Sequence, residues 1–394
     1  MKPIEIAKDV YWVGVIDWNI RDFHGYLTEQ GSTYNAYLIL DEKVTLIDTV
    51  KKEFADQLLA NIGEIIDPKK IDIVISNHTE PDHSGGLPRV LHKIGEDKPL
   101  YCSKLGHKNL ALHYREKWNY QPVENGGTLN IGRRNLHFLE TRMVHWPDSM
   151  FTYCPEDKIL YSSDGFGQHY AGWERFDDEL GEAIMPYAKK YFANILLLYA
   201  PLIQQLIKKV TELNLDIRLI CPDHGIIWRQ DPLKIVQAYA DWGNQEPRKK
   251  AVVAYDTMWH STEKMAEAIV AGLITEGIEA KPMHLRTFHR SDVVTEVLDA
   301  GALLVGSPTL NNGLYPTVSD FLTYLKGLKP KKKLVGAFGS FGWSGEAVKL
   351  INQELEAMKL DLFDKGLNIQ FVPNDQDLKT AFEWGKKIGQ ALKK

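Results

Sequence analysis

The stretch His78-Thr79-Glu80-Pro81-Asp82-His83 places four candidate metal ligands within six residues. It directly follows the apolar run Ile71-Asp72-Ile73-Val74-Ile75-Ser76, which predicts a buried strand. Two imidazoles and two carboxylates that are brought together on one tight turn lose hydration, and the like charges repel each other. A bound cation removes this penalty. The stretch therefore predicts a metal site at the end of a strand.

Three later apolar runs are also followed by a His or an Asp: residues 136–139 by His145, residues 158–161 by Asp164, and residues 216–220 by His224. A single loop histidine is usually a surface residue, and an aspartate before a glycine is usually a turn residue. Four strand ends with the same chemistry make coincidence a poor explanation. If these strands share one sheet, all the candidate ligands collect along one edge of it.

The composition is that of a globular protein, with 394 residues, 44% apolar and 25% charged. This length is sufficient for two domains. The net charge of −5 gives no basic face for a nucleic acid, and no apolar stretch is long enough to cross a membrane. The three cysteines are scattered and include no CxxC pair. We therefore expect a cytoplasmic protein without disulfides and without a cysteine-held iron or zinc module in this chain.

The chain is predicted to be α/β, and its pattern of strands and helices changes at a polar linker, residues 243–250. Residues 1–247 alternate strands with long loops, and include helical patterns at 87–94 and 186–198. Residues 248–394 alternate strands with helices, with Ser291 expected to cap the second helix of this half. Such alternation predicts a doubly wound parallel sheet.

The order of elements in the first half resembles the metallo-β-lactamase fold, whose signature is H-x-H-x-D-H followed by later His, Asp and His. Glu80 occupies the third position of that signature here. A carboxylate in place of an imidazole hardens the site and favours iron over zinc. The pattern H-x-E-x-D-H resembles the flavodiiron proteins. The resemblance extends to these further segments: 17–19, 23–25, 33–37, 145–150, 166–168 and 224–225.

This resemblance implies a metallo-β-lactamase-like αββα sandwich over residues 1–247 and a flavodoxin-like domain over residues 248–394. It also implies two irons bridged by Asp164. One iron would be held by His78, Glu80 and His145, and the other by Asp82, His83 and His224. Whether His83 binds iron stays open, because Asp82 and a water could complete that site.

Three loops in the second half are candidates for binding a flavin at the strand ends of the sheet. They contribute the residues Thr257, Met258, Trp259, His260, Ser261, Thr262, Ser307, Pro308, Thr309, Leu310, Asn311, Asn312, Ser340, Phe341, Gly342, Trp343, Ser344 and Gly345. Hydroxyls and free N–H groups at a helix start can hold a phosphate without Lys or Arg. Flavodoxins usually carry a glycine where Trp259 or His260 stands. No dinucleotide fingerprint is present, so FMN is favoured over FAD or NAD.

The implied enzyme is an oxidoreductase that uses two irons and FMN to reduce dioxygen to water, nitric oxide to nitrous oxide, or both. This activity would serve oxygen detoxification in an anaerobe. The resemblance implies rubredoxin as the electron donor, with a reduced deazaflavin as the alternative. It also implies a head-to-tail homodimer, with a tetramer left open. The preferred gas and the proton donors are not decided by the sequence.

Two other readings compete with this one: a zinc hydrolase with a flavodoxin-like appendage, and an FMN-binding electron carrier with a vestigial metal loop. Glu80 argues against the first, and the complete ligand set argues against the second. The basic run Lys329-Pro330-Lys331-Lys332-Lys333 could steer an acidic donor, although a solvated turn is the more common role of such a run.

Overall fold

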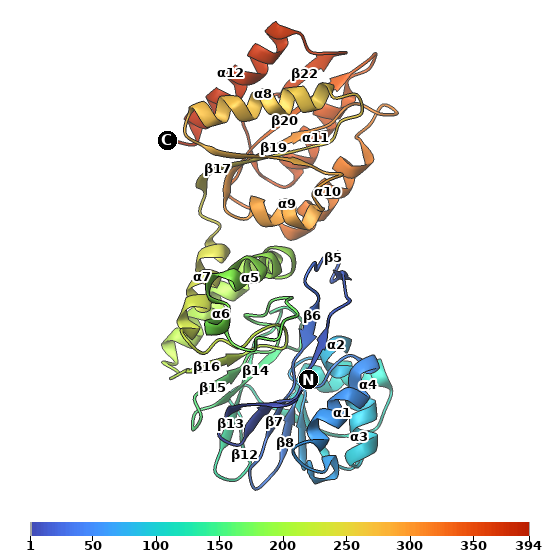
Figure 1. The fold of residues 1–394 in the computed structure, drawn as a ribbon, viewed down its shortest axis with the longest axis vertical. Coiled ribbons are helices and arrows are strands. Elements are labelled where there is room, and N and C mark those ends of the chain that lie inside the picture. The colour runs from blue at the N-terminus through green and yellow to red at the C-terminus, as the bar shows by residue number, and fades with distance from the viewer. Residues whose placement is uncertain (1, 394) are drawn as a thin grey trace. The chain divides into compact units, whose positions relative to one another are not determined.

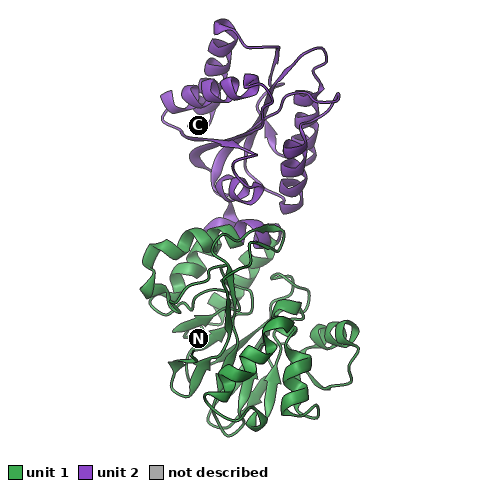
Figure 2. Ribbon diagram, turned by 45° about the vertical axis from the view of Figure 1, so that its right-hand side comes forward, with its two compact units in different colours: residues 1–191, 199–240 green, residues 192–198, 241–394 purple. Residues whose placement is uncertain are grey.

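The computed structural model describes residues 2–393, which divide into two units (Figure 2). Unit 1 comprises the chain up to Tyr191 together with Tyr199–Ala240, and unit 2 comprises Phe192–Leu198 together with the chain from Asp241. The predicted domain boundary after residue 247 falls at the start of strand β17 (Arg248–Tyr255) and stays a prediction. Helix α7 (Pro232–Asn244) and β17 leave only residues 245–247 between them, so the linker is shorter than residues 243–250.

Two sheets form the centre of unit 1. The first has the order β1-β2-β7-β8-β9-β10-β11: Ile4–Ala7, Val10–Trp12, Tyr37–Ile39, Thr45–Ile47, Ile73–Ile75, Pro99–Ser103 and Asn119–Val123. The second has the order β12-β13-β14-β15-β16: Thr128–Asn130, Asn135–Glu140, Met150–Cys154, Ile159–Tyr161 and Leu219–Cys221. Two short hairpins add β3 (Val15–Asp17) with β6 (Ser32–Tyr34), and β4 (Asp22–Phe23) with β5 (Tyr26–Leu27).

Alternation along the central strands explains the layering of unit 1. In β7, Leu38 faces one core, whereas its neighbours Tyr37 and Ile39 face another. Successive side chains of a strand point to opposite faces, so a strand that is apolar throughout is covered on both sides. One core lies against the helices α1 (Ala55–Gly63), α3 (Leu87–Ile94) and α4 (Lys104–Tyr114), and the other lies between the two sheets. Figure 1 shows these helices beside the first sheet.

The remaining helices of unit 1 are α2 (Pro81–Ser84), α5 (Met185–Tyr191) and α6 (Ala200–Glu212), with most of α7. Figure 1 shows α5, α6 and α7 on the side of β14, β15 and β16. The arrangement confirms the predicted αββα sandwich. The ligand-bearing strands do not all share one sheet, so the condition considered from the sequence is not met. Strand β9 belongs to the first sheet, whereas β13, β15 and β16 belong to the second. The ligands meet because the two sheets are stacked.

Unit 2 is a parallel sheet with the order β18-β17-β19-β20-β21, in which β22 also pairs with β20. The strands after β17 are β18 (Glu279–His284), β19 (Ala300–Gly306), β20 (Leu334–Phe341), β21 (Asp361–Leu362) and β22 (Leu367–Gln370). The helices are α8 (Ser261–Thr275), α9 (Arg290–Val297), α10 (Pro316–Leu328), α11 (Glu346–Ala357) and α12 (Asp375–Ala391). This order is flavodoxin-like and confirms the predicted doubly wound sheet.

Two local predictions differ from the structure. Ser291 does not cap α9, because the N-cap is His289, whose side chain accepts a hydrogen bond from the Ser291 N–H. The helical pattern at 186–198 breaks into α5, the π-helix Phe192–Leu196 and the 3₁₀ helix Leu197–Tyr199. Residues 192–198 belong to unit 2, where the Tyr324 hydroxyl donates to Asn194 Oδ1 at 2.9 Å.

The close packing of α8 on α12 predicts a stability effect at Gly272. A Cβ at this position would meet the Phe382 carbonyl oxygen at 2.1 Å. We expect Gly272→Ala to destabilise unit 2 by about 1–3 kcal/mol, because backbone must move to admit the methyl group. Thermal unfolding of the full chain should show a lowered transition. The matched control is Gly327→Ala in α10, where nothing lies within 4 Å. An unchanged transition in Gly272→Ala would contradict the packing described here.

Candidate metal centre and cofactor pocket

The candidate ligands of unit 1 come from loops at the ends of four strands. His78, Glu80, Asp82 and His83 follow β9, and the last two lie in the short helix α2. The loop between β13 and β14 carries His145, and the loops after β15 and β16 carry Asp164 and His224. All seven side chains are brought into one cluster, as the sequence predicted.

One half of the cluster surrounds one oxygen of Asp164. His145 Nε2 lies 2.9 Å from Asp164 Oδ2, and His78 Nε2 lies 3.1 Å from the same oxygen. Glu80 Oε2 lies 3.1 Å from His145 Nε2. These three side chains are the set expected for one iron.

The other half surrounds the second oxygen of Asp164. His83 Nε2 and His224 Nε2 lie 3.4 and 3.5 Å from Asp164 Oδ1, and 3.0 Å from each other. Asp82 Oδ2 lies 3.2 Å from His83 Nε2 and 3.1 Å from His224 Nε2. Asp164 thus presents one oxygen to each half, and His83 Nε2 lies as close to Oδ1 as His224 Nε2 does.

Unpartnered polar atoms test whether these residues suit a metal. His78 Nε2, Glu80 Oε2, His145 Nε2 and both carboxylate oxygens of Asp82 and of Asp164 are buried and lack a hydrogen-bond partner. Buried polar atoms normally have partners, and leaving so many without one in a single place is costly. Imidazole nitrogens and carboxylate oxygens that converge on shared points fit metal ions, and carboxylate-rich sets suit iron.

The electrostatics of the cluster favour positive charge at its centre. Burial raises the pKa of Asp164, but the charge of His78 and the close approach of the His145 and His83 imidazoles outweigh it and hold that pKa well below its usual range. Burial lowers the pKa of His145, but Asp164 and Glu80 outweigh it and raise that pKa to about 9. The carboxylates are therefore ionised and ready to bind cations.

One backbone carbonyl and one side-chain hydroxyl orient two of the imidazoles. His224 Nδ1 donates to the Thr33 carbonyl at 2.7 Å, which leaves Nε2 free to bind a metal. His78 Nδ1 lies 3.0 Å from Ser163 Oγ. Several non-glycine residues next to the ligands have left-handed backbone, among them Met143 (φ 64°) and Ser163 (φ 51°). Such conformations are costly and concentrate at functional sites.

Sequence reasoning missed several polar neighbours of the cluster. Asp48 follows β8 and accepts hydrogen bonds from Asn77. A search for His or Asp residues after apolar runs could therefore have identified it. His24 Nε2 lies 3.1 Å from Glu80 Oε1, and its Nδ1 lies 3.3 Å from His169 Nε2. His24 reaches the cluster from the β4–β5 hairpin, and no local pattern indicates this position. From the sequence, His24 and His169 were candidates for lining a gas pocket and for supplying protons, and neither role was decided.

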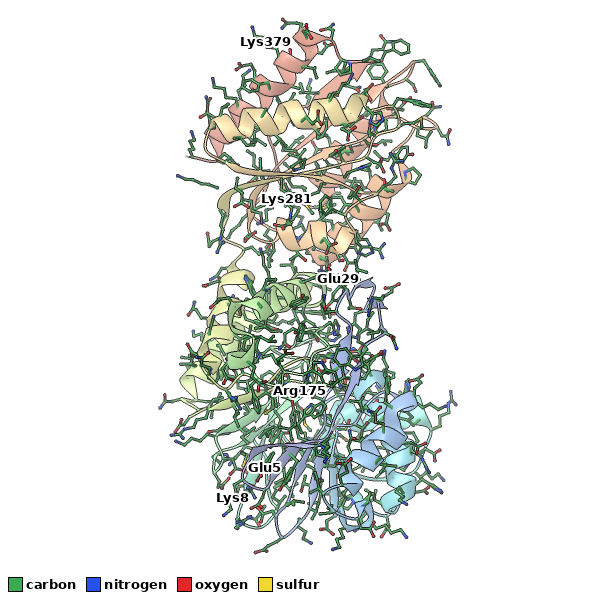
Figure 3. The ribbon with its side chains drawn as sticks, viewed as in Figure 1. Glu5, Lys8, Glu29, Arg175, Lys281 and Lys379 are labelled. Carbon is green, nitrogen blue, oxygen red and sulfur yellow. The ribbon has the colours of Figure 1, made fainter. Side chains whose placement is uncertain are left out.

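Arg175, labelled in Figure 3, is a buried cation of unit 1 that the sequence did not single out. Its Nη2 donates to the Gly172 carbonyl at 2.6 Å, and its guanidinium lies 4.9 Å from the centre of the Trp12 ring. Burial lowers its pKa to about 10. Arg175 therefore ties the loop after β15 to the core between the sheets.

A pocket of about 490 Å³ opens onto the metal cluster. Glu80 and Asp82 are the only candidate ligands that line it, and Phe23, Pro81 and Tyr114 supply apolar surface beside them. Lys51 also lines it, with its ammonium 4.0 Å from the centre of the Phe23 ring. A small apolar molecule could reach the carboxylate side of the cluster by this route.

Unit 2 holds a second pocket, of about 610 Å³, at the ends of its parallel strands. Twelve of the predicted flavin-binding residues line it: Met258, Trp259, Ser261, Pro308, Thr309, Asn311, Asn312, Ser340, Phe341, Gly342, Trp343 and Ser344. Thr257, His260, Thr262, Ser307, Leu310 and Gly345 lie in the same loops without lining it. Phe371 and Val372, which follow β22, also line the pocket and were missed.

The rim of this pocket is aromatic and exposed. The side chains of Trp259 and Trp343 are 81% and 90% exposed, so neither packs as core. Two lysines of the basic run at 329–333 have protein partners, although three of its four lysines are exposed. Lys333 is buried and donates to the Leu298 carbonyl, and Lys332 pairs with Glu246.

The geometry of Asp164 predicts how metal is lost on substitution. We expect Asp164→Ala to lower the content of both metal ions, because both halves of the cluster share this carboxylate. His83→Ala should lower only one. Metal analysis of the purified variants measures the content, and His137→Ala on β13, outside the cluster, is the control. Full occupancy in Asp164→Ala would refute the bridging position.

No helix within residues 2–393 combines the length and the apolar character needed to cross a membrane.

Comparisons with known proteins agree with this architecture. Residues 33–225 match the family model described as ODP family beta lactamase, and residues 253–385 match the flavodoxin model. The chain is 46% identical over 396 residues to a nitric oxide reductase of Moorella thermoacetica, with 99% of each chain covered.

Solved structures are similar over the same length. The rubredoxin oxygen:oxidoreductase of Desulfovibrio gigas has a TM-score of 0.97 and 42% identity, with 100% of this chain and 99% of that chain covered. The flavodiiron protein of Giardia intestinalis has a TM-score of 0.96 and 38% identity, with 100% and 97% covered. With both units matched in one continuous chain, this protein belongs to the flavodiiron protein family.

Proposed function

We propose that this chain is an oxidoreductase that reduces dioxygen to water, nitric oxide to nitrous oxide, or both, at a pair of irons supplied with electrons by FMN. The observation that carries the proposal is the position of Asp164, with one oxygen facing each half of a seven-residue ligand set. A hydrolytic site with a single metal ion does not require a carboxylate that faces two sets of ligands.

The proposed ligand sets are His78, Glu80 and His145 for one iron, and Asp82, His83 and His224 for the other. Asp164 fixes the separation of the two sets because its carboxylate is buried and cannot turn toward solvent. Glu80 adds negative charge at the position where zinc hydrolases carry a histidine, which favours iron. Thr33 and Ser163 hold His224 and His78 in the orientation that directs Nε2 inward.

When bound, the two irons and FMN together store four electrons. Four electrons and four protons convert O₂ into two waters. The reduction of two NO to N₂O and water needs only two electrons and two protons. The chain supplies the route and the binding surfaces for this chemistry. The apolar lining of Phe23, Pro81 and Tyr114 admits an uncharged gas to the Glu80 and Asp82 side of the cluster. The exposed indole of Trp343 can stack on the flavin ring.

The gas preference follows from a single comparison of rates. A preparation with two irons and one FMN per chain should consume dioxygen without releasing peroxide, or convert nitric oxide to nitrous oxide, and steady-state rates with both gases rank the two activities. Colourless zinc protein with hydrolase activity would contradict the proposal. Yellow protein that binds no metal would instead support an electron carrier.

Electrons are proposed to come from rubredoxin or a similar small iron protein, with a reduced deazaflavin as the alternative donor. Because Lys332 and Lys333 already have protein partners, the basic run at 329–333 contributes little to steering an acidic donor. The proposed location of the reaction is the cytoplasm.

A head-to-tail homodimer is proposed, so that the flavin of one subunit serves the irons of its partner; a tetramer made of such dimers is also compatible. The dimer would have two-fold symmetry. Light scattering after gel filtration should give at least twice the chain mass of 44.9 kDa. A monomer that reduces dioxygen at full rate would rule the dimer out.

A further inference from the structure

The cofactor pocket of unit 2 must bind a phosphate without a charged side chain, since none of its lining residues is ionisable at neutral pH. The first loop, residues 257–260, leads into the N-terminus of the 15-residue helix α8. Thr257 is buried, and its hydroxyl oxygen has no hydrogen-bond partner. Binding of a phosphate here depends on hydroxyls and backbone N–H groups, and therefore on the exact course of the loop.

Asp256, directly before this loop, is fully buried and gathers donors from three elements. Its Oδ1 accepts from the Thr257 N–H at 2.6 Å and from Arg286 Nε at 2.9 Å, and lies 3.2 Å from His284 Nε2. Its Oδ2 accepts from the Thr317 hydroxyl at 2.5 Å, at the first turn of α10. One carboxylate thus joins the ends of β17 and β18 to the start of α10.

Arg286 holds the same loop from the other side. Its Nε donates to Asp256, and its Nη2 donates to the Thr257 carbonyl oxygen. The N–H and the C=O of Thr257 are therefore both fixed, one by the carboxylate and one by the guanidinium. Because the guanidinium is a rigid planar fork, both contacts form together, and a lysine cannot reproduce them.

We infer that Asp256 and Arg286 are positioning residues that hold the loop at Thr257 in the conformation that receives the FMN phosphate, and so set the preference of the pocket for FMN over riboflavin. This inference rests on the proposed FMN site and names the groups that shape it. Neither residue lines the pocket, and both hydrogen-bond to the backbone of Thr257, which directly precedes the lining residue Met258. The positive charge of Arg286 also neutralises the carboxylate of Asp256, which would otherwise repel a phosphate.

Flavin titrations of the full chain, freed of flavin, test the inference through quenching of flavin fluorescence. We expect Arg286→Ala to weaken FMN binding by roughly ten-fold or more, as loss of charge-assisted hydrogen bonds does, and to leave riboflavin binding unchanged. Arg248→Ala is the matched control, because Arg248 lies at the opposite end of β17 and its side chain is 77% exposed. It should alter neither affinity.

Two further variants separate positioning from simple charge. Arg286→Lys keeps the charge but loses the fork, so FMN binding should stay weakened. Asp256→Asn removes a negative charge near the phosphate, so a purely electrostatic role would tighten FMN binding, whereas positioning predicts no tightening.

Restoration of FMN affinity in Arg286→Lys, or an equal loss of FMN and riboflavin binding in Arg286→Ala, would overturn the inference. Wild-type protein that binds neither flavin would instead overturn the proposed function.

Discussion

The packing of six ionisable side chains around the carboxylate of Asp164 is the constraint on which unit 1 depends. Apart from Glu80 and His145, which are partly exposed, these side chains are buried, and many of their polar atoms have no protein partner. Burying such a set is costly unless a cation lies among the groups. The sandwich makes the arrangement possible because both of its sheets end their strands at one place. Loops that follow β9 in one sheet and β13 and β16 in the other then surround Asp164, which lies in the loop after β15.

The pocket of unit 2 is also formed by polar loops at strand ends, but its requirements differ from those of the metal cluster. The pocket must hold a large, flat molecule with one charged end, yet its lining is neutral and its rim is aromatic. Charge is present behind the first loop, where Asp256 and Arg286 compensate each other. The charged side chains of the metal cluster lie at its centre, whereas Asp256 and Arg286 lie outside the lining of the flavin pocket. This difference suits metal ions in one unit and an organic cofactor in the other.

Much of the site could be predicted from sequence because its residues have local signals. His78 to His83 are dense enough to stand out alone, and His145, Asp164 and His224 each follow an apolar run. The flavin loops were identified because parallel strands end at one edge. His24 had no such signal, since a two-residue hairpin brings it to Glu80. Phe371 and Val372 were missed because β22 is short and half-exposed. Whether β9 and β15 share a sheet could not be decided from the sequence, because alternation shows which faces are buried and not which strands pair.

The central claim is that Asp164 joins two iron sites. A crystal structure of the iron-loaded protein, with anomalous diffraction recorded on both sides of the iron absorption edge, tests it most directly. We predict two iron peaks, one beside Oδ1 and the other beside Oδ2 of Asp164. A single peak beside one oxygen of Asp164 would contradict the claim, and so would peaks whose strength does not change across the iron edge, as expected for zinc.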